Sequence, residues 1–163
     1  MNISIVGIGT RVKKYYLPIL QNLEKVNIES IWSRTKETLD NNSKIIGDIN
    51  TTTEIDDICK SNSDLIVVCL PETVKYEYTK YILKNSNHKV TIETPIVDRN
   101  FFNYCAENGY LDRVVAMEQW PHLFVERVKK EIIGKFFTNQ KLILAENHWR
   151  YFDYHGIAML KDY

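Results

Sequence analysis

Two glycines directly follow the first apolar run of the chain, in an arrangement suited to binding a diphosphate. Residues 3–6, Ile-Ser-Ile-Val, lead into Gly7, Ile8 and Gly9. At a strand-to-helix turn the first glycine permits a tight bend, and the second lets the backbone approach a pyrophosphate that the helix N-terminus stabilises. Val12 stands where the usual pattern has a third glycine. We predict a dinucleotide-binding turn; an ordinary strand–turn–helix with two glycines is the alternative.

A serine and an arginine follow the second apolar run, residues 27–32. Ser33 and Arg34 occupy the position that lies beside the adenosine ribose in a dinucleotide-binding fold. An acidic residue there accepts the 2′-hydroxyl of NAD, whereas a basic residue accommodates the 2′-phosphate of NADP. Arg34 offers a planar pair of donors, Ser33 adds a hydroxyl, and Lys36 adds charge. The pattern predicts NADP in preference to NAD; an exposed Ser-Arg turn before a helix is the alternative.

The spacing of cysteines and histidines predicts no metal site. Cys59, Cys69 and Cys105 are far apart in the sequence and form no C-x-x-C pair, and His122 and His148 have no partner at ligand spacing. An odd number of cysteines without motif spacing also argues against a disulfide framework. We expect the cysteines to be ordinary packing residues.

Short apolar runs alternate with helical stretches, which is typical of a parallel sheet covered on both faces. The expected strands are residues 3–6, 27–32, a weak strand near 44–46, 64–70, 88–92 and 113–117. The expected helices are residues 11–25, 54–60, 73–83 and 100–108, with Thr53 as the N-cap of the second. Pro18 should kink the first helix or shift its regular start. Right-handed crossovers then give an α/β fold with a doubly wound parallel (Rossmann) sheet.

Composition excludes several classes of protein. Lys+Arg and Asp+Glu balance at 21 each, so no bulk charge favours nucleic acid or an anionic membrane surface as a partner. No apolar run approaches the roughly 20 residues that span a bilayer, and the N-terminus does not have the pattern of a signal peptide. We therefore expect a cytoplasmic protein with no nucleic-acid or membrane partner.

Five short segments together carry a resemblance to a known family. They are Val6-Gly7-Ile8-Gly9, Leu17-Pro18, Ser33-Arg34, Leu70-Pro71 and Glu93-Thr94-Pro95. In this order the chain resembles the glucose–fructose oxidoreductase / inositol dehydrogenase family of NAD(P)-dependent oxidoreductases, over about residues 2–120. The ordered set of strand ends is more specific than any single motif.

The resemblance implies a set of cofactor-binding residues at the ends of the strands. The glycine turn and the start of the first helix would face the pyrophosphate, the end of the second strand would bind the adenosine phosphate, and the ends of the fourth and fifth strands would line the nicotinamide side. By this resemblance the residues are Gly7, Gly9, Thr10 and Arg11, then Ser33 and Arg34, then Leu70, Pro71, Glu72 and Glu93.

The chain departs from the family at Thr94. The family has a lysine there, between cofactor and substrate, where an ammonium can polarise a hydroxyl or carbonyl and take part in proton transfer. A threonine hydroxyl donates a hydrogen bond but carries no charge and is a poor acid at neutral pH. Thr94 therefore remains a candidate catalytic residue with a weakened version of the family's chemistry.

The resemblance also implies a second domain of which this chain has only a part. We predict a dinucleotide-binding domain over residues 1–118 and the incomplete start of an α+β substrate or oligomerisation domain over residues 119–163. The latter contains one strand pattern, residues 142–149, and a lone strand leaves an exposed edge. The chain is then a half-enzyme, a fragment, or a protein whose strand pairs with another chain, in a homodimer or with a partner subunit.

Asp153 and His155 are the remaining catalytic candidates. They resemble a segment in which the family places an aspartate and a histidine near the substrate, although their spacing here is shorter. An imidazole titrates where proton transfer to a carbonyl or imine is efficient. A histidine at a helix start without a catalytic role is the alternative.

Two functions follow from these features. The first is an NADP-dependent oxidoreductase that moves a hydride to or from a small carbonyl, alcohol or imine substrate. The second is a non-catalytic dinucleotide-binding subunit with a regulatory or assembly role, which Thr94 favours.

Overall fold

Strands and helices alternate along the part of the chain that the computed structural model describes, residues 1–96 and 98–117. The strands are β1 (Asn2–Val6), β2 (Asn27–Trp32), β3 (Asn50–Thr52), β4 (Leu65–Val68), β5 (Lys89–Glu93) and β6 (Val114–Met117). The helices are η1 (Val12–Tyr16), α1 (Leu17–Leu20), α2 (Lys36–Asp40), α3 (Ser43–Ile46), α4 (Ile55–Cys59), α5 (Glu72–Asn85), α6 (Arg99–Glu107) and the 3-10 turn η2 (Leu111–Arg113). Residues Met1–Ala116 form one unit.

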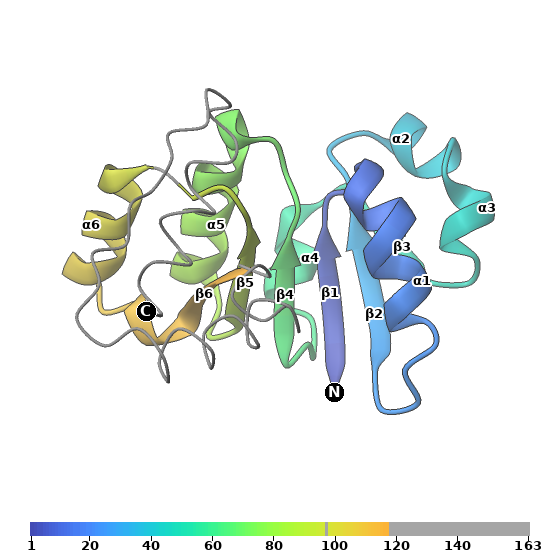
Figure 1. The fold of residues 1–163 in the computed structure, drawn as a ribbon, viewed down its shortest axis with the longest axis horizontal. Helices are drawn as coiled ribbons and strands as arrows, with labels where there is room; N and C mark the ends of the chain where they lie inside the picture. The colour runs from blue at the N-terminus through green and yellow to red at the C-terminus, as the bar shows by residue number, and fades with distance from the viewer. Residues whose placement is uncertain (97, 118–163) are drawn as a thin grey trace, which may run out of the picture. The chain divides into compact units, whose positions relative to one another are not determined.

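The strands form one six-stranded sheet in the order β3-β2-β1-β4-β5-β6 (Figure 1). The pairs β1–β2, β1–β4, β2–β3 and β4–β5 are all parallel. The strand order reverses at β1, which lies between β2 and β4, and this is the switch point of a doubly wound Rossmann sheet. The predicted fold class is therefore confirmed. The predicted second domain, residues 119–163, lies outside the described residues.

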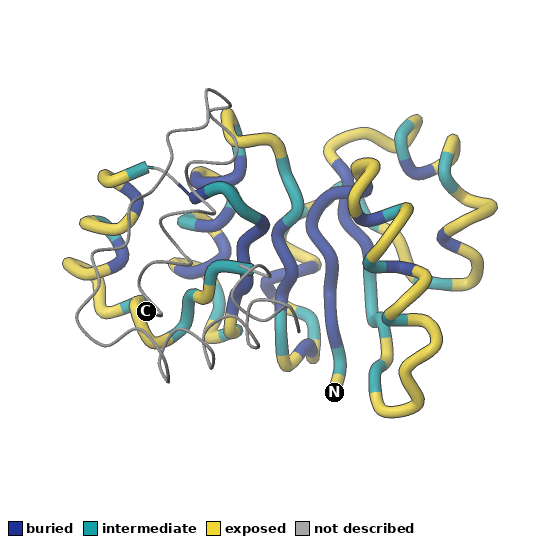
Figure 2. Tube along the Cα trace, in the orientation of Figure 1, coloured by how far each residue is buried: buried dark blue, intermediate teal, exposed yellow. Residues whose placement is uncertain are grey.

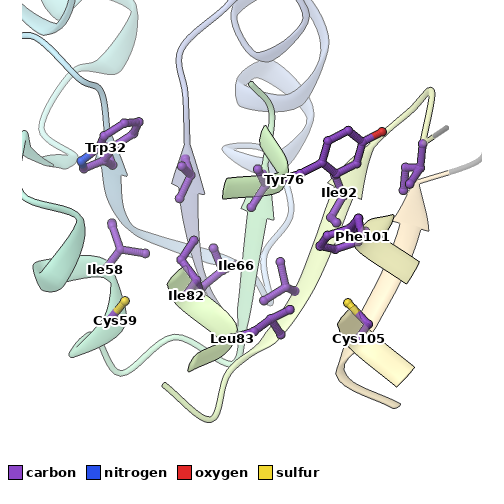
Figure 3. Close-up of a cluster of buried hydrophobic side chains, with 14 residues drawn as sticks. Trp32, Ile58, Cys59, Ile66, Tyr76, Ile82, Leu83, Ile92, Phe101 and Cys105 are labelled. Carbon is purple, nitrogen blue, oxygen red and sulfur yellow. The ribbon is translucent and has the colours of Figure 1, made fainter. Parts of the chain in front are cut away.

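The core forms where helices cover both faces of the central strands. Four of the five residues of β1 and three of the four residues of β4 are buried, as Figure 2 shows for the middle of the sheet. Side chains of α5 and α6 pack against the sheet in a cluster that includes Ile66, Ile82, Ile92 and Phe101 (Figure 3). Burying an aliphatic or aromatic side chain of this size contributes about 1.5–3 kcal/mol. The cluster fixes the carboxyl ends of β4 and β5 in place.

The first helix does not run over residues 11–25 as predicted. It opens as the π-helical segment Val12–Tyr16 and continues as the short α-helix Leu17–Leu20. The amide that follows the π segment donates to the carbonyl five residues earlier, as is typical of a π turn. Pro18 has no N–H and crowds the preceding turn, which explains the change of helix type. Because the helix ends early, Leu23 lies beyond it and is exposed.

The third strand lies later in the chain than predicted. Residues 44–46 belong to the helix α3, in which Ile46 is buried and Ile45 is exposed. The true strand, β3, is a three-residue polar edge strand without the apolar alternation that identifies a strand. The predicted N-cap of α4 is also wrong, because Glu54 rather than Thr53 occupies that position.

Arg113, which directly precedes β6, ties the end of α5 to the start of β5. Its guanidinium donates to the backbone carbonyls of Leu83 at 3.1 Å, Ser86 at 2.7 Å and His88 at 3.1 and 3.2 Å. The last carbonyls of a helix have no partner within the helix. One side chain therefore satisfies acceptors throughout the α5–β5 connection.

We expect Arg113→Met to lower the free energy of unfolding by about 2 kcal/mol, because it leaves several part-buried carbonyls without a charged donor. Arg99→Met, at an exposed position in α6, is the matched control and should change the stability by less than about 0.5 kcal/mol. Chemical denaturation followed by circular dichroism measures both. Equal effects of the two substitutions would contradict the role of Arg113.

Candidate functional site

The turn after β1 requires a glycine at its first position but not at its second. Gly7 has φ +103°, and a Cβ there would lie 2.5 Å from the carbonyl oxygen of Cys69 and 2.9 Å from a methyl of Leu70. The Gly7 amide donates to the carbonyl of Trp32 at 2.9 Å, which fixes the turn against β2. At Gly9, by contrast, a Cβ would meet nothing within 4 Å. The open space above Gly9 is where a pyrophosphate approaches the backbone in this kind of turn.

A cleft of about 400 Å³ opens beside this turn, at the carboxyl ends of β1, β2 and β4. This is the switch point of the sheet, where doubly wound folds bind their ligands. The residues that line the cleft are Gly7, Ile8, Gly9, Trp32, Ser33, Arg34, Thr35, Thr38, Cys69, Leu70, Pro71, Thr73, Val74 and Tyr78. Residues from both sides of the switch point thus surround one cavity of the size expected for a small-molecule site.

Six of the ten predicted cofactor residues line this cleft. They are Gly7, Gly9, Ser33, Arg34, Leu70 and Pro71. The other four, Thr10, Arg11, Glu72 and Glu93, do not line it. Of the predicted catalytic residues, Thr94 lies at the end of β5, whereas Asp153 and His155 lie outside the described residues.

The cationic side of the cleft is formed by the end of β2. Ser33 is buried and its amide donates to the carbonyl of Thr52 at 3.1 Å, so the strand end is fixed. Arg34 is exposed, and none of the described residues forms a hydrogen bond or an ion pair with its guanidinium. Thr35 caps α2 by accepting from the amide of Thr38. A rigid strand end therefore presents a guanidinium that is available to an anion.

Aromatic residues form the apolar side of the same cleft, and sequence reasoning missed them. The rings of Trp32 and Tyr78 lie with their centroids 4.7 Å apart, and the Trp32 indole donates to the carbonyl of Thr53 at 2.9 Å. Tyr78 lies one helical turn after Val74 on α5, and both line the cleft. Val74 and Tyr78 are four residues apart, on one face of a helix that starts at a strand end, and this spacing was the sequence signal that could have placed Tyr78 in the cleft.

A charged cluster lies at the end of β5. The guanidinium of Arg11 and the hydroxyl of Tyr16 donate to different oxygens of the Glu93 carboxylate. Residues five apart point about 140° away from each other on an α-helix, and the π segment brings these two together. Thr94 donates to the same carboxylate at 3.3 Å. The cation of Arg11, predicted to bind a pyrophosphate, is therefore paired with a carboxylate.

Burial in this cluster makes the two weak acids beside Glu93 weaker. The pKa of the Cys69 thiol is raised by burial and by the charge of Glu93, although Arg11 opposes the shift. The pKa of Tyr16 is raised by burial and by its hydrogen bond to Glu93. Both groups stay protonated at neutral pH, so Cys69 is no thiolate nucleophile and Tyr16 is no ready proton donor.

Two negative findings apply to the described residues. No group of three or more His, Cys, Asp or Glu side chains among residues 1–96 and 98–117 is placed to hold a metal ion. No helix in that part of the chain is both long and apolar enough to cross a membrane.

Solved structures share this fold at low sequence identity. A scyllo-inositol dehydrogenase from Lactobacillus casei with bound NAD(H) and scyllo-inositol matches with a TM-score of 0.68 at 18% identity, over 83% of this chain and 41% of its own. KijD10, a 3-ketoreductase from Actinomadura kijaniata in complex with TDP-benzene and NADP, matches with a TM-score of 0.68 at 17% identity, over 86% of this chain and 45% of its own. This chain therefore spans less than half of either protein. No curated protein sequence matches it.

A family model provides the assignment at the level of sequence. The model for the Gfo/Idh/MocA oxidoreductases, described as an oxidoreductase family with an NAD-binding Rossmann fold, matches residues 1–102. The match covers the glycine turn, the end of β2, and β4 and β5 with the segment that follows them. The chain belongs to this oxidoreductase family.

Proposed function

We propose that the chain is the cofactor-binding part of an NADP-dependent oxidoreductase that acts on a small carbonyl, alcohol or imine substrate. The observation that carries the choice of NADP is Arg34: an exposed guanidinium, without a partner among the described residues, on the wall of the switch-point cleft. A guanidinium matches the oxygens of a phosphate with two parallel donors. Among the described residues, no carboxylate lines this cleft to accept the 2′-hydroxyl of NAD.

The residues of the cleft divide by the part of the cofactor that they would hold. Gly7 makes the tight turn, Gly9 leaves room for the pyrophosphate, and Arg34 with Ser33 would bind the 2′-phosphate. Trp32 and Tyr78 provide an apolar surface beside that site. When bound, the nicotinamide would supply or accept the hydride, and the protein would orient it and exclude water.

The proposed substrate site needs more than the described residues supply. Residues after 117, with Asp153 and His155 as candidate acid or base, or a second chain would complete the substrate pocket. We propose a homodimer or a partner subunit for this reason. We also propose a cytoplasmic location, which the free thiols of Cys59, Cys69 and Cys105 support.

A second function is favoured by one feature of the β5 end. Thr94 stands where the family has a lysine, and the neighbouring Glu93 carboxylate is engaged by Arg11, Tyr16 and Thr94 itself. With no free acid among these groups, the chain would bind the dinucleotide without turning it over and would act as a regulatory or assembly subunit.

Titration of the purified chain with NADPH and NADH, followed by the fluorescence of the reduced nicotinamide, tests the cofactor site. We expect binding of both with a preference for NADPH. No binding of either would refute the cofactor site, and a preference for NADH would refute the choice of NADP. Two incubations separate the two functions: the NADPH complex with aldoses and keto sugars, whose carbonyls accept a hydride, and the NADP⁺ complex with inositols, whose alcohols donate one. Only the oxidoreductase lowers the nicotinamide absorbance in the first incubation or raises it in the second.

A further inference from the structure

A lysine is among the largest fully buried side chains of the described residues. Lys75 lies in the first turn of α5 and is 2% exposed. Its ammonium donates to the backbone carbonyl of Glu93 at 3.3 Å and to the backbone carbonyl of Pro95. These two carbonyls flank Thr94. The buried cation therefore binds the chain on both sides of the position where the family has its lysine.

Burying the ammonium of Lys75 has a desolvation cost that its contacts must offset. Desolvation penalises the charged form of Lys75 and lowers its pKa, although the charges of Glu72 and Glu93 oppose the shift. No carboxylate among the described residues lies within ion-pair distance of it. Two peptide carbonyls thus hold the cation where an apolar side chain would fill the same space without a desolvation cost. What the lysine adds is a fixed position for those carbonyls.

The segment after β5 is held from a second direction as well. Arg11 and Tyr16, from the start of the first helix, bind the side-chain carboxylate of Glu93, while Lys75 binds the backbone. Glu93 is 9% exposed, and Thr94 is half-buried between the two sets of contacts. Groups from two helices thus fix the backbone and the side chain of one short segment.

In the proposed complex, this segment would face the half of the dinucleotide that does not carry the 2′-phosphate. In a doubly wound sheet the pyrophosphate lies at the end of β1 and the adenosine ribose at the end of β2. The other nucleoside would then extend across β4 towards β5, because these strands lie on the opposite side of β1 from β2.

We propose, on the basis of the function proposed above, that Lys75 is a positioning residue for the nicotinamide half of the cofactor. It acts through the Glu93–Pro95 segment and holds Thr94 at the end of β5. Lys75 itself touches neither cofactor nor substrate, since its ammonium is buried behind that segment.

Two ligands separate this role from a general loss of structure. NADPH occupies both halves of the site, whereas adenosine 2′,5′-bisphosphate occupies the adenosine half alone. We expect Lys75→Met to weaken NADPH binding about tenfold, because the Glu93–Pro95 segment loses the donor that fixes its two carbonyls, and to leave the affinity for the bisphosphate within about twofold. Lys75→Arg, which keeps donors and charge, should recover most of the NADPH affinity. Lys84→Met, at an exposed position of the same helix, should change neither affinity.

The outcomes are distinguishable. If the unaltered chain binds neither ligand, the proposed function fails and this role fails with it. If the unaltered chain binds NADPH and Lys75→Met binds it equally well, or loses both ligands equally, only the role of Lys75 is overturned.

If Lys75→Met does not fold, hydrogen exchange on the unaltered chain replaces it. NADPH should slow amide exchange over residues 93–96 more than the bisphosphate does. Equal protection by the two ligands would also overturn the role.

Discussion

Replacing Gly7 with alanine is expected to lower the free energy of unfolding by roughly 4 kcal/mol and to abolish cofactor binding. Two costs combine: a sparsely populated backbone conformation costs about 1–3 kcal/mol, and overpacking costs about 1–3 kcal/mol. The new Cβ would lie 2.5 Å from the carbonyl oxygen of Cys69, a backbone atom of the β4–α5 connection that cannot rotate away. Any relief moves the turn or the connection, and both line the cleft.

Alanine substitutions at two other glycines measure the cost of backbone strain separately from the cost of the clash. Gly47 has φ +65° but nothing within 4 Å of an added Cβ, so Gly47→Ala should cost about 1–2 kcal/mol from backbone strain alone. A Cβ added at Gly9 meets nothing within 4 Å, and Gly9 has no positive φ, so Gly9→Ala should leave the stability nearly unchanged. It should weaken NADPH binding, because the methyl enters the space proposed for the pyrophosphate. Thermal denaturation and NADPH titration give both quantities. If the Gly7→Ala variant were as stable as the Gly47→Ala variant, the predicted clash would be contradicted.

The fold was predictable where the local pattern and the long-range structure agree. Residues 65–68 form a continuous apolar run and are a buried parallel strand, and Gly109 ends α6 with φ +70°. The edge strand β3 was not predictable, because its three residues are polar and are paired on one side only. Its position is set by pairing with β2, which a local pattern does not contain.

The site was predictable only where a motif marks a strand end. Gly7 and Arg34 lie in the cleft as their motifs suggested, whereas Tyr78 reaches it from a helix face with no motif of its own. The pairing of Arg11 with Glu93 joins residues 82 positions apart through a π turn. A pattern in sequence does not show which cation meets which carboxylate across the sheet, so this ion pair could not be predicted.

Replacing Arg34 with alanine is expected to weaken NADPH binding about 10- to 100-fold and NADH binding by less than about threefold. Hydrogen bonds between charged groups contribute about 1.5–3 kcal/mol each, and only NADPH carries the 2′-phosphate that would receive them. Because the Arg34 side chain is exposed, its removal breaks no hydrogen bond or ion pair with the described residues. The stability should therefore be unchanged, which makes the difference between the two cofactors directly interpretable. Fluorescence titration with each reduced cofactor measures it.

Two further variants test whether geometry or charge matters at this position. Lys44→Ala removes one exposed positive charge from α3, which does not line the cleft, and should affect NADPH and NADH alike by less than twofold, an expectation for screened surface charge. Arg34→Lys keeps the charge but loses the planar pair of donors, so it should fall between alanine and the unaltered chain. Equal weakening of NADPH and NADH by Arg34→Ala would place the guanidinium against a part common to both cofactors, such as the adenine ring, because only a contact with the 2′-phosphate distinguishes them.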